Sequence, residues 1–128
     1  MRVSVKIWIE DEEQKLIFGG GKTEVLQLID ETGSISKAAQ RVGMNYKKAW
    51  SHIKILEKNI EDELVVTQKG QGEQSGSCLT PKAREVIQTY KILQYDIKKY
   101  ADKRFKELFL KDNKEILSIK EKSFDEAE

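Results

Sequence analysis

Apolar and polar positions alternate over the first ten residues of the chain. This period of two predicts a strand over residues 2–10 with one buried face, and after a polar turn residues 15–18 can return as a second strand. The apolar positions of the first strand are Val3, Val5, Ile7 and Ile9. We therefore expect the chain to begin with a β-hairpin.

The spacing of apolar positions then changes to three and four residues, which predicts three successive helices. The first covers residues 23–31, the second begins after a cap at Ser34 or Ser36, and the third covers about residues 46–59. Gly43 lies between the second and the third, where a tight turn often needs a positive φ. Two short helices joined in this way are typical of a helix-turn-helix.

A second hairpin and a long helix complete the predicted order. Residues 64–67 are β-branched or apolar, residues 69–77 form a Gly-rich loop, and residues 78–80 can return as a strand. Thr80 can cap a final helix that reaches about residue 110. The predicted fold class is mainly α with small β-hairpins: a winged helix-turn-helix with an N-terminal β-hairpin and a long C-terminal dimerisation helix.

Three parts follow from this order. Residues 1–80 are expected to form the winged helix-turn-helix DNA-binding domain, and residues 81–110 the dimerisation helix of the same domain. Residues 111–128 form a charged C-terminal tail.

The charge distribution is more informative than the net charge of +1. Residues 34–60 contain six cations and one anion, a local net charge of +5, as expected of a phosphate-binding face. One cysteine and one histidine leave no internal disulfide and no zinc-finger ligand set. No segment has the roughly 20 apolar residues of a membrane span, so we expect a cytoplasmic protein. We also expect that it holds no cofactor and no metal.

The third helix is predicted to place its cations opposite its core face. At about 100° per residue, Ala49, Ile53 and Leu56 share one side and the lysines lie on the other, which favours double-stranded DNA as partner. Trp50 falls at the edge of the core face, where we expect it to pack between helices. The predicted DNA-binding residues are Ser36, Asn45, Tyr46, Lys47, Lys48, Ser51, Lys54 and Lys69, the last in the wing.

The last helix carries an apolar seam with alternating steps of three and four residues. The seam is longer than a small domain can cover, which favours a two-fold homodimer. Such a dimer would hold two recognition helices about one DNA turn apart, roughly 34–36 Å. The predicted dimerisation residues are Val86, Tyr90, Leu93, Ile97 and Tyr100.

The helix-turn-helix segment resembles the N-terminal DNA-binding domain of the ModE-type molybdate-responsive regulators. The resemblance runs from the first strand to about Tyr95. The more general pattern is also similar to the LysR-type winged helix, and both families imply a dimer that binds DNA through the second helix and the wing. The motifs that carry it are Gly33-Ser34-Ile35-Ser36 with Ala38-Ala39, Gly43-Met44-Asn45-Tyr46-Lys47 with Ala49-Trp50, and Leu79-Thr80.

Some features depart from the ModE-type pattern. Asn45 stands where the family commonly has Ser, and the wing contains Glu73, so operator preference is expected to differ. The family's regulators usually continue into a molybdate-binding region of small β-barrels, for which this sequence has no strand-rich segment. We therefore expect a stand-alone DNA-binding half that represses constitutively or takes its signal from an effector-sensing partner protein.

Two other classes of function agree with single features of the sequence. Residues 19–23 end like a phosphate-binding loop, but Leu16 stands where that motif needs a glycine, and no catalytic triad can be assembled. We therefore expect no catalytic residues and no enzyme. The other alternative is a winged-helix protein-interaction module without DNA binding, which the near-neutral net charge favours and the lysine face disfavours.

Overall fold

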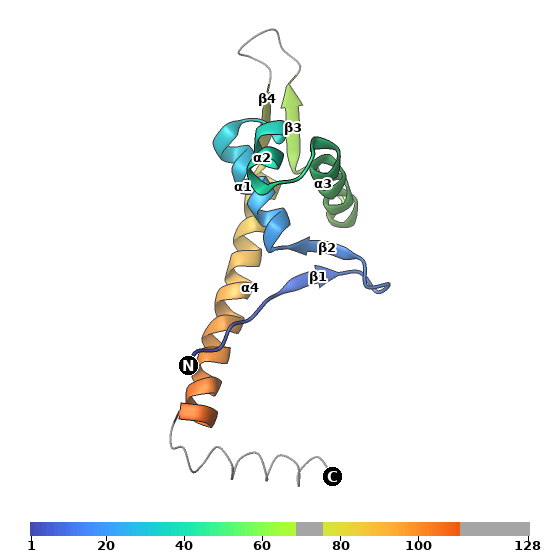
Figure 1. Cartoon of the computed structure of the whole chain (residues 1–128). Coiled ribbons are helices and arrows are strands. Elements are labelled where there is room, and N and C mark those ends of the chain that lie inside the picture. The colour runs from blue at the N-terminus through green and yellow to red at the C-terminus, as the bar shows by residue number, and fades with distance from the viewer. Residues whose placement is uncertain (69–75, 111–128) are drawn as a thin grey trace. The chain divides into compact units, whose positions relative to one another are not determined.

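The computed structural model describes residues 1–68 and 76–110 and confirms the predicted fold class. The described residues divide into two compact units, one of Ile7–Lys91 and one of Met1–Lys6 with Ile92–Leu110. Figure 1 shows the elements: β1 (Trp8–Glu10), β2 (Leu16–Gly19), α1 (Gly20–Thr32), α2 (Ile35–Val42), α3 (Tyr46–Ile60), β3 (Val65–Gln68), β4 (Gly76–Leu79), α4 (Pro81–Phe105) and a final π-helical turn (Lys106–Leu110).

The N-terminal hairpin is shorter than the alternation predicts. The strand expected over residues 2–10 is limited to β1, which pairs antiparallel with β2. Because β2 ends at Gly19 and α1 begins directly after it, residues 2–7 have no strand opposite them. The helix predicted to begin at Thr23 is α1, and it begins three residues earlier, at Gly20.

Local caps define the helix-turn-helix as the sequence predicted. Ser34, and not Ser36, caps α2, since its Oγ accepts a hydrogen bond of 3.1 Å from the backbone N–H of Lys37. Gly43 ends α2 with φ of 76°, and the side chain of Asn45 accepts from the N–H of Lys48 at 2.8 Å to cap α3. These caps fix the turn between the two helices.

One core joins the helices of the Ile7–Lys91 unit. Small residues of α2 and α3 are fully buried, which lets the two helices approach closely. The first three turns of α4 add Ala83, Ile87 and Tyr90 to this core. The largest buried side chains are Phe18, Leu26, Ile29, Leu64 and Val25.

Tyr90 corrects one expectation for the last helix. It is only 3% exposed, its ring packs edge-on against Phe18 at 4.7 Å, and its hydroxyl donates to the carbonyl of Ile7. Burial raises the pKa of its phenol. Tyr90 therefore belongs to the core of its own chain, and the predicted dimer seam loses this residue because core and seam share the same helical spacing.

The root of the wing, the β3–β4 hairpin, is attached to the turn that follows α1. The N–H of Ser77 donates to the carbonyl of Gly33 at 2.8 Å. A Cβ at Gly76 would lie 2.9 Å from that same oxygen, so this close approach requires glycine. At the other end, the Thr80 hydroxyl donates to the Glu63 carbonyl at 2.7 Å and accepts from Ala83, which caps α4 as predicted.

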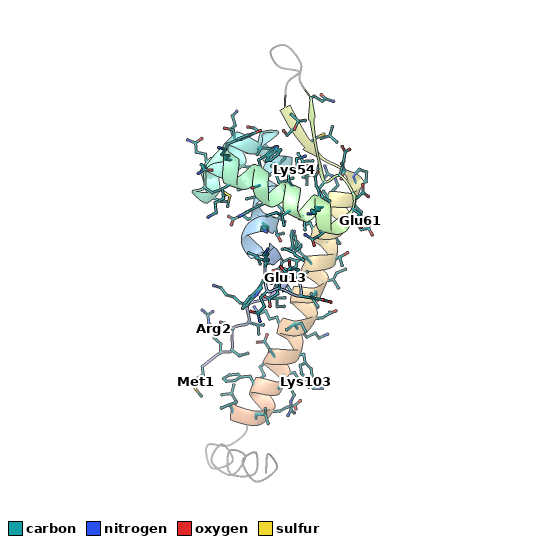
Figure 2. The ribbon with its side chains drawn as sticks, turned by 90° about the vertical axis from the view of Figure 1, so that its right-hand side faces the viewer. Met1, Arg2, Glu13, Lys54, Glu61 and Lys103 are labelled. Atoms are coloured by element: carbon teal, nitrogen blue, oxygen red, sulfur yellow. The ribbon has the colours of Figure 1, made fainter. Side chains whose placement is uncertain are left out.

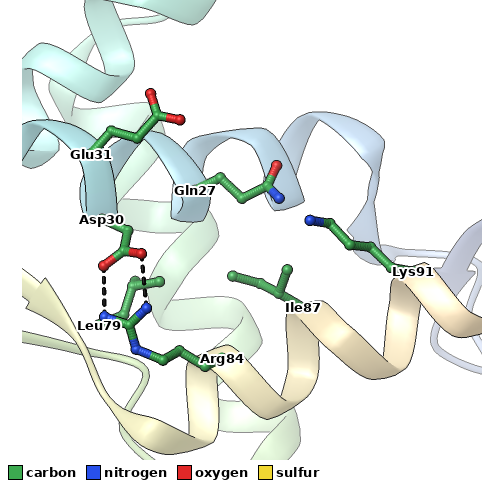
Figure 3. A pocket seen from close by; sticks show the side chains of 7 residues that line it. All are labelled: Gln27, Asp30, Glu31, Leu79, Arg84, Ile87 and Lys91. Atoms are coloured by element: carbon green, nitrogen blue, oxygen red, sulfur yellow. Dashed lines mark hydrogen bonds and ion pairs between the residues drawn. The ribbon is translucent and has the colours of Figure 1, made fainter.

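A bidentate ion pair links α1 and α4 in the same unit. Figure 3 shows both oxygens of the Asp30 carboxylate facing the Arg84 guanidinium, at 2.7 and 2.8 Å. The hydrogen bonds and charge of Asp30 raise the pKa of Arg84. The pair borders a shallow cavity that Gln27, Ile87 and Lys91 also line.

Candidate nucleic-acid interface

The two faces of α3 separate as the sequence predicted. Ala49, Ile53 and Leu56 are buried, with exposures of 0%, 4% and 2%. The polar residues of the opposite face are exposed, namely Lys47, Lys48, Ser51, Lys54 and Lys58. Their side chains line one surface of a single helix, so they can meet an anionic partner together.

Lys54 differs from the other lysines of this face because its ammonium has partners within the chain. Figure 2 marks Lys54 on α3. Its Nζ lies 3.1 Å from Oε1 of Glu57 and 5.4 Å from the ring centroid of Trp50. In the described part of the chain, Lys47, Lys48 and Lys58 form no ion pair. The positive charge of these three residues is therefore more available to an anionic partner than that of Lys54.

Glu57 joins α3 to the β3–β4 hairpin. Its side chain is only 12% exposed, and its Oε2 accepts from the backbone N–H groups of Leu64 at 2.8 Å and Val65 at 3.3 Å. Burial alone would raise the pKa of Glu57, but these hydrogen bonds and Lys54 outweigh it and lower the pKa. In the sequence Glu57 is only the one anion of residues 34–60, and no local pattern marks a contact with residues seven and eight positions away.

Two aromatic residues lie on the exposed surface of α3. Tyr46 is 51% exposed and Trp50 is 45% exposed. The expectation that Trp50 packs between helices is wrong, because Ala49 and Ile53, on the core side of the wheel, already fill the core contact. A large apolar side chain at the border of a charged helix face could have suggested this exposure.

A groove brings the start of α2, the start of α3 and the wing strands together. It is lined by Ser36 and Lys37 of α2, Tyr46 of α3, and Thr67 and Ser77 of the wing. The hydroxyls of Thr67 and Ser77 lie 3.2 Å apart across the hairpin. Ser36 and Tyr46, both predicted binding residues, thus share one groove, whereas Asn45 uses its side-chain oxygen to cap α3. Lys69, the predicted wing cation, lies outside the described residues.

Lys22 of α1 and His52 of α3 are two partly or fully buried basic side chains of the same unit. Lys22 is 6% exposed and its ammonium donates to the carbonyls of Leu16 and Ile17 at 3.0 and 3.1 Å. Burial lowers the pKa of Lys22, and burial together with Lys22 and Lys48 lowers the pKa of His52. Both causes disfavour the charged imidazolium, and His52 itself is half-buried.

The remaining predicted dimerisation residues are more accessible than Tyr90. Leu93 and Ile97 are both 40% exposed and Tyr100 is 63% exposed, whereas Val86 is half-buried against the core. Ile92 and Tyr95, at 51% and 65%, add to the exposed apolar surface of the same helix. The C-terminal half of α4 thus presents apolar side chains over several turns.

Neither a metal site nor a membrane span is present in residues 1–68 and 76–110. No group of three potential metal ligands occurs there, and no helix in that part is long and apolar enough to cross a bilayer.

Comparison with known families matches residues 22–84 to the bacterial regulatory helix-turn-helix proteins of the LysR family. Among curated relatives, molybdenum-pterin-binding protein MopB of Rhodobacter capsulatus is 31% identical over 81 residues, which is 63% of this chain and 30% of MopB. The DNA-binding transcriptional dual regulator ModE of Escherichia coli is 33% identical over 63% of this chain and 31% of its own length. These relatives confirm the resemblance to ModE-type regulators.

The match covers less than a third of each of these two relatives. Their names describe regulators or a molybdenum-pterin-binding protein, in agreement with the expectation that the chain is not an enzyme. Among solved structures, Vibrio fischeri DarR, crystallised in complex with DNA, superposes with a TM-score of 0.50 at 19% identity, over 73% of this chain and 30% of DarR. This similarity supports the winged-helix fold.

Proposed function

We propose that this chain is a sequence-specific DNA-binding transcriptional regulator that acts as a homodimer, because residues 22–84 match the helix-turn-helix of the LysR family. The observation that carries the proposal is the lysine face of α3. Three exposed lysines without an ion pair among the described residues project from one helix that the caps at Ser34 and Asn45 hold in place.

In this proposal α3 enters the major groove. Asn45, Lys47, Lys48 and Ser51 lie in its first two turns, the part of a recognition helix from which base edges are reached. The lysines neutralise phosphates and supply affinity without sequence information. The wing, over residues 64–80, contacts the flanking backbone or minor groove, and the groove at Ser36 and Tyr46 lies where such a contact would continue.

The homodimer is proposed to form through the C-terminal half of α4. Leu93, Ile97 and Tyr100 are exposed apolar residues on consecutive turns, and water contact with such a surface is unfavourable. A second copy of the same helix would cover it with matching chemistry. We propose that the regulator either represses constitutively or takes its signal from an effector-sensing partner protein.

Fluorescence anisotropy with the full chain tests DNA binding directly. The probes are a labelled duplex from the promoter region of the chain's own gene and a scrambled duplex of the same composition, each at about 50 mM and about 200 mM salt. Tighter binding to the promoter duplex with a steep salt dependence is the expected result. Equal or absent binding to both duplexes would contradict the proposal and favour a protein-interaction module.

A further inference from the structure

The exposed aromatic residues of α3 need an explanation that the lysine face does not give. We call Tyr46 and Trp50 the aromatic pair. They lie four residues apart, on adjacent turns, and leave 51% and 45% of their surfaces exposed. Lysines suffice to bind phosphates, and an aromatic ring adds nothing to that electrostatic attraction. The aromatic pair therefore has a different role from the cations beside it.

Trp50 lies within reach of the surface that the lysines occupy. At about 100° per residue it is rotated by only about 40° from Lys54 and about 60° from Lys47 around the axis of α3. A duplex that meets those lysines would also meet the exposed part of the indole. The ring of Trp50 is thus placed between the basic face of α3 and the side of α3 on which Tyr46 lines the groove.

The indole is also held in a defined position. Lys54 Nζ lies 5.4 Å from its ring centroid and 3.1 Å from Glu57, and Glu57 is fixed by two backbone N–H groups at the start of β3. This chain of contacts runs from the wing through α3 to the ring. A side chain ordered before binding loses less conformational entropy in the complex, and it discriminates better between partners that differ by one group.

We propose that Trp50, supported by Tyr46, is a specificity-determining residue that contacts the 5-methyl group of thymine in the major groove. The 5-methyl group is the apolar feature of the major-groove edges, and apolar side chains read it by excluding water. The inference rests on the proposed function, since it assigns one class of base contact to that interface. It gives the regulator a preference for A·T pairs at defined positions of each half-site.

The test replaces thymine by uracil, which removes only the methyl group. Duplexes that bind the full-length wild-type chain are first selected from a randomised 40-base-pair pool, and each thymine of the best duplex is then exchanged singly. The wild-type chain is expected to lose about fourfold in affinity at one or two positions per half-site, the value for one buried methyl group at about 0.8 kcal/mol. Trp50→Ala is expected to bind the thymine and uracil duplexes equally at those positions.

Two further variants make the result specific. Trp50→Leu keeps an apolar side chain and is expected to retain part of the preference for the thymine duplex over the uracil duplex. This variant still tests the proposal if Trp50→Ala does not fold. Lys58→Ala, on the same helix, removes a phosphate contact, and it should weaken binding to both duplexes by the same factor. Circular dichroism melts check that each variant is folded.

The failures of the two proposals are distinguishable. If no sequence is enriched from the pool, the proposed function is wrong. If a sequence is enriched but no thymine position responds to uracil, the assignment of Trp50 is wrong. A fourfold thymine effect that persists in both Trp50 variants would equally overturn the assignment, while leaving sequence-specific binding intact.

Discussion

The exposed surfaces of α3 and of the C-terminal half of α4 differ in chemistry. On α3, Lys47, Lys48 and Lys58 are exposed, and charged side chains are stable in water without any partner. On α4, Leu93 and Ile97 are 40% exposed, and contiguous apolar surface is unfavourable in water. The α3 surface therefore favours a charged partner that binds reversibly, whereas the α4 surface favours a partner that stays bound.

The largest expected effect is on dimer formation through the apolar surface of α4. Leu93→Asp combined with Ile97→Asp should convert a dimer into a monomer, because a dimer interface would have to bury two unpaired carboxylates from each chain, at several kcal/mol each. We expect the dimer dissociation constant to rise by more than about 100-fold, which sedimentation equilibrium measures.

A matched variant places aspartate at two exposed polar positions of the same helix. Gln88→Asp with Lys98→Asp should leave the association state unchanged. A wild-type chain that sediments as a monomer at micromolar concentration would show that the apolar residues of α4 do not form a dimer.

A smaller effect is expected where α3 meets the wing. Glu57→Gln keeps one acceptor oxygen but loses the charge that receives two backbone N–H groups and Lys54, and it should lower the free energy of unfolding by about 1.5 kcal/mol. Since the folded pKa of Glu57 is lowered, its stabilisation is complete above the usual value of 4.5 and is lost as pH falls through the folded pKa.

Urea unfolding of both proteins between pH 7 and pH 3 measures this difference. The gap between wild type and Glu57→Gln should close toward pH 3. Glu63→Gln alters an exposed carboxylate close to the same strand and should stay within about 0.5 kcal/mol of wild type. A gap that is constant with pH would mean that the charge of Glu57 does not stabilise the junction.

The smallest expected effect distinguishes the first half of α4, which contributes to the core, from its exposed second half. Tyr90→Phe keeps the ring contact with Phe18 but removes the hydrogen bond to Ile7, and it should cost about 1 kcal/mol of unfolding free energy. The association state should not change, because Tyr90 is 3% exposed within its own chain. Thermal melts and sedimentation check both statements, with Tyr95→Phe, at a 65% exposed position, as the control. If Tyr90→Phe weakened the dimer, Tyr90 would have to be assigned to the dimer interface.

The sequence predicted those features of the fold that depend on local contacts. Ser34, Gly43 and Asn45 form the expected caps and turn because each acts on backbone groups within three or four residues. The buried face of α3 followed from helical spacing for the same reason. These features place the candidate interface.

The errors of the sequence analysis concern contacts between distant residues. The length of β1 depends on where β2 ends, and the alternation of residues 2–10 carries no information about that. Tyr90 fits a core and a dimer seam equally well by spacing, and only its contact with Phe18 decides between them. The role of Glu57 likewise depends on residues that fold beside it from the next strand.

The central claim is that the lysine face of α3 binds the DNA backbone. The most direct test compares wild type with the triple variant Lys47→Gln, Lys48→Gln, Lys58→Gln by anisotropy on the promoter duplex across about 50–200 mM salt. We predict weaker binding and a slope of log affinity against log salt that falls by up to about 2.7, or 0.9 for each lost phosphate contact. An unchanged affinity and slope in a folded triple variant would contradict the claim.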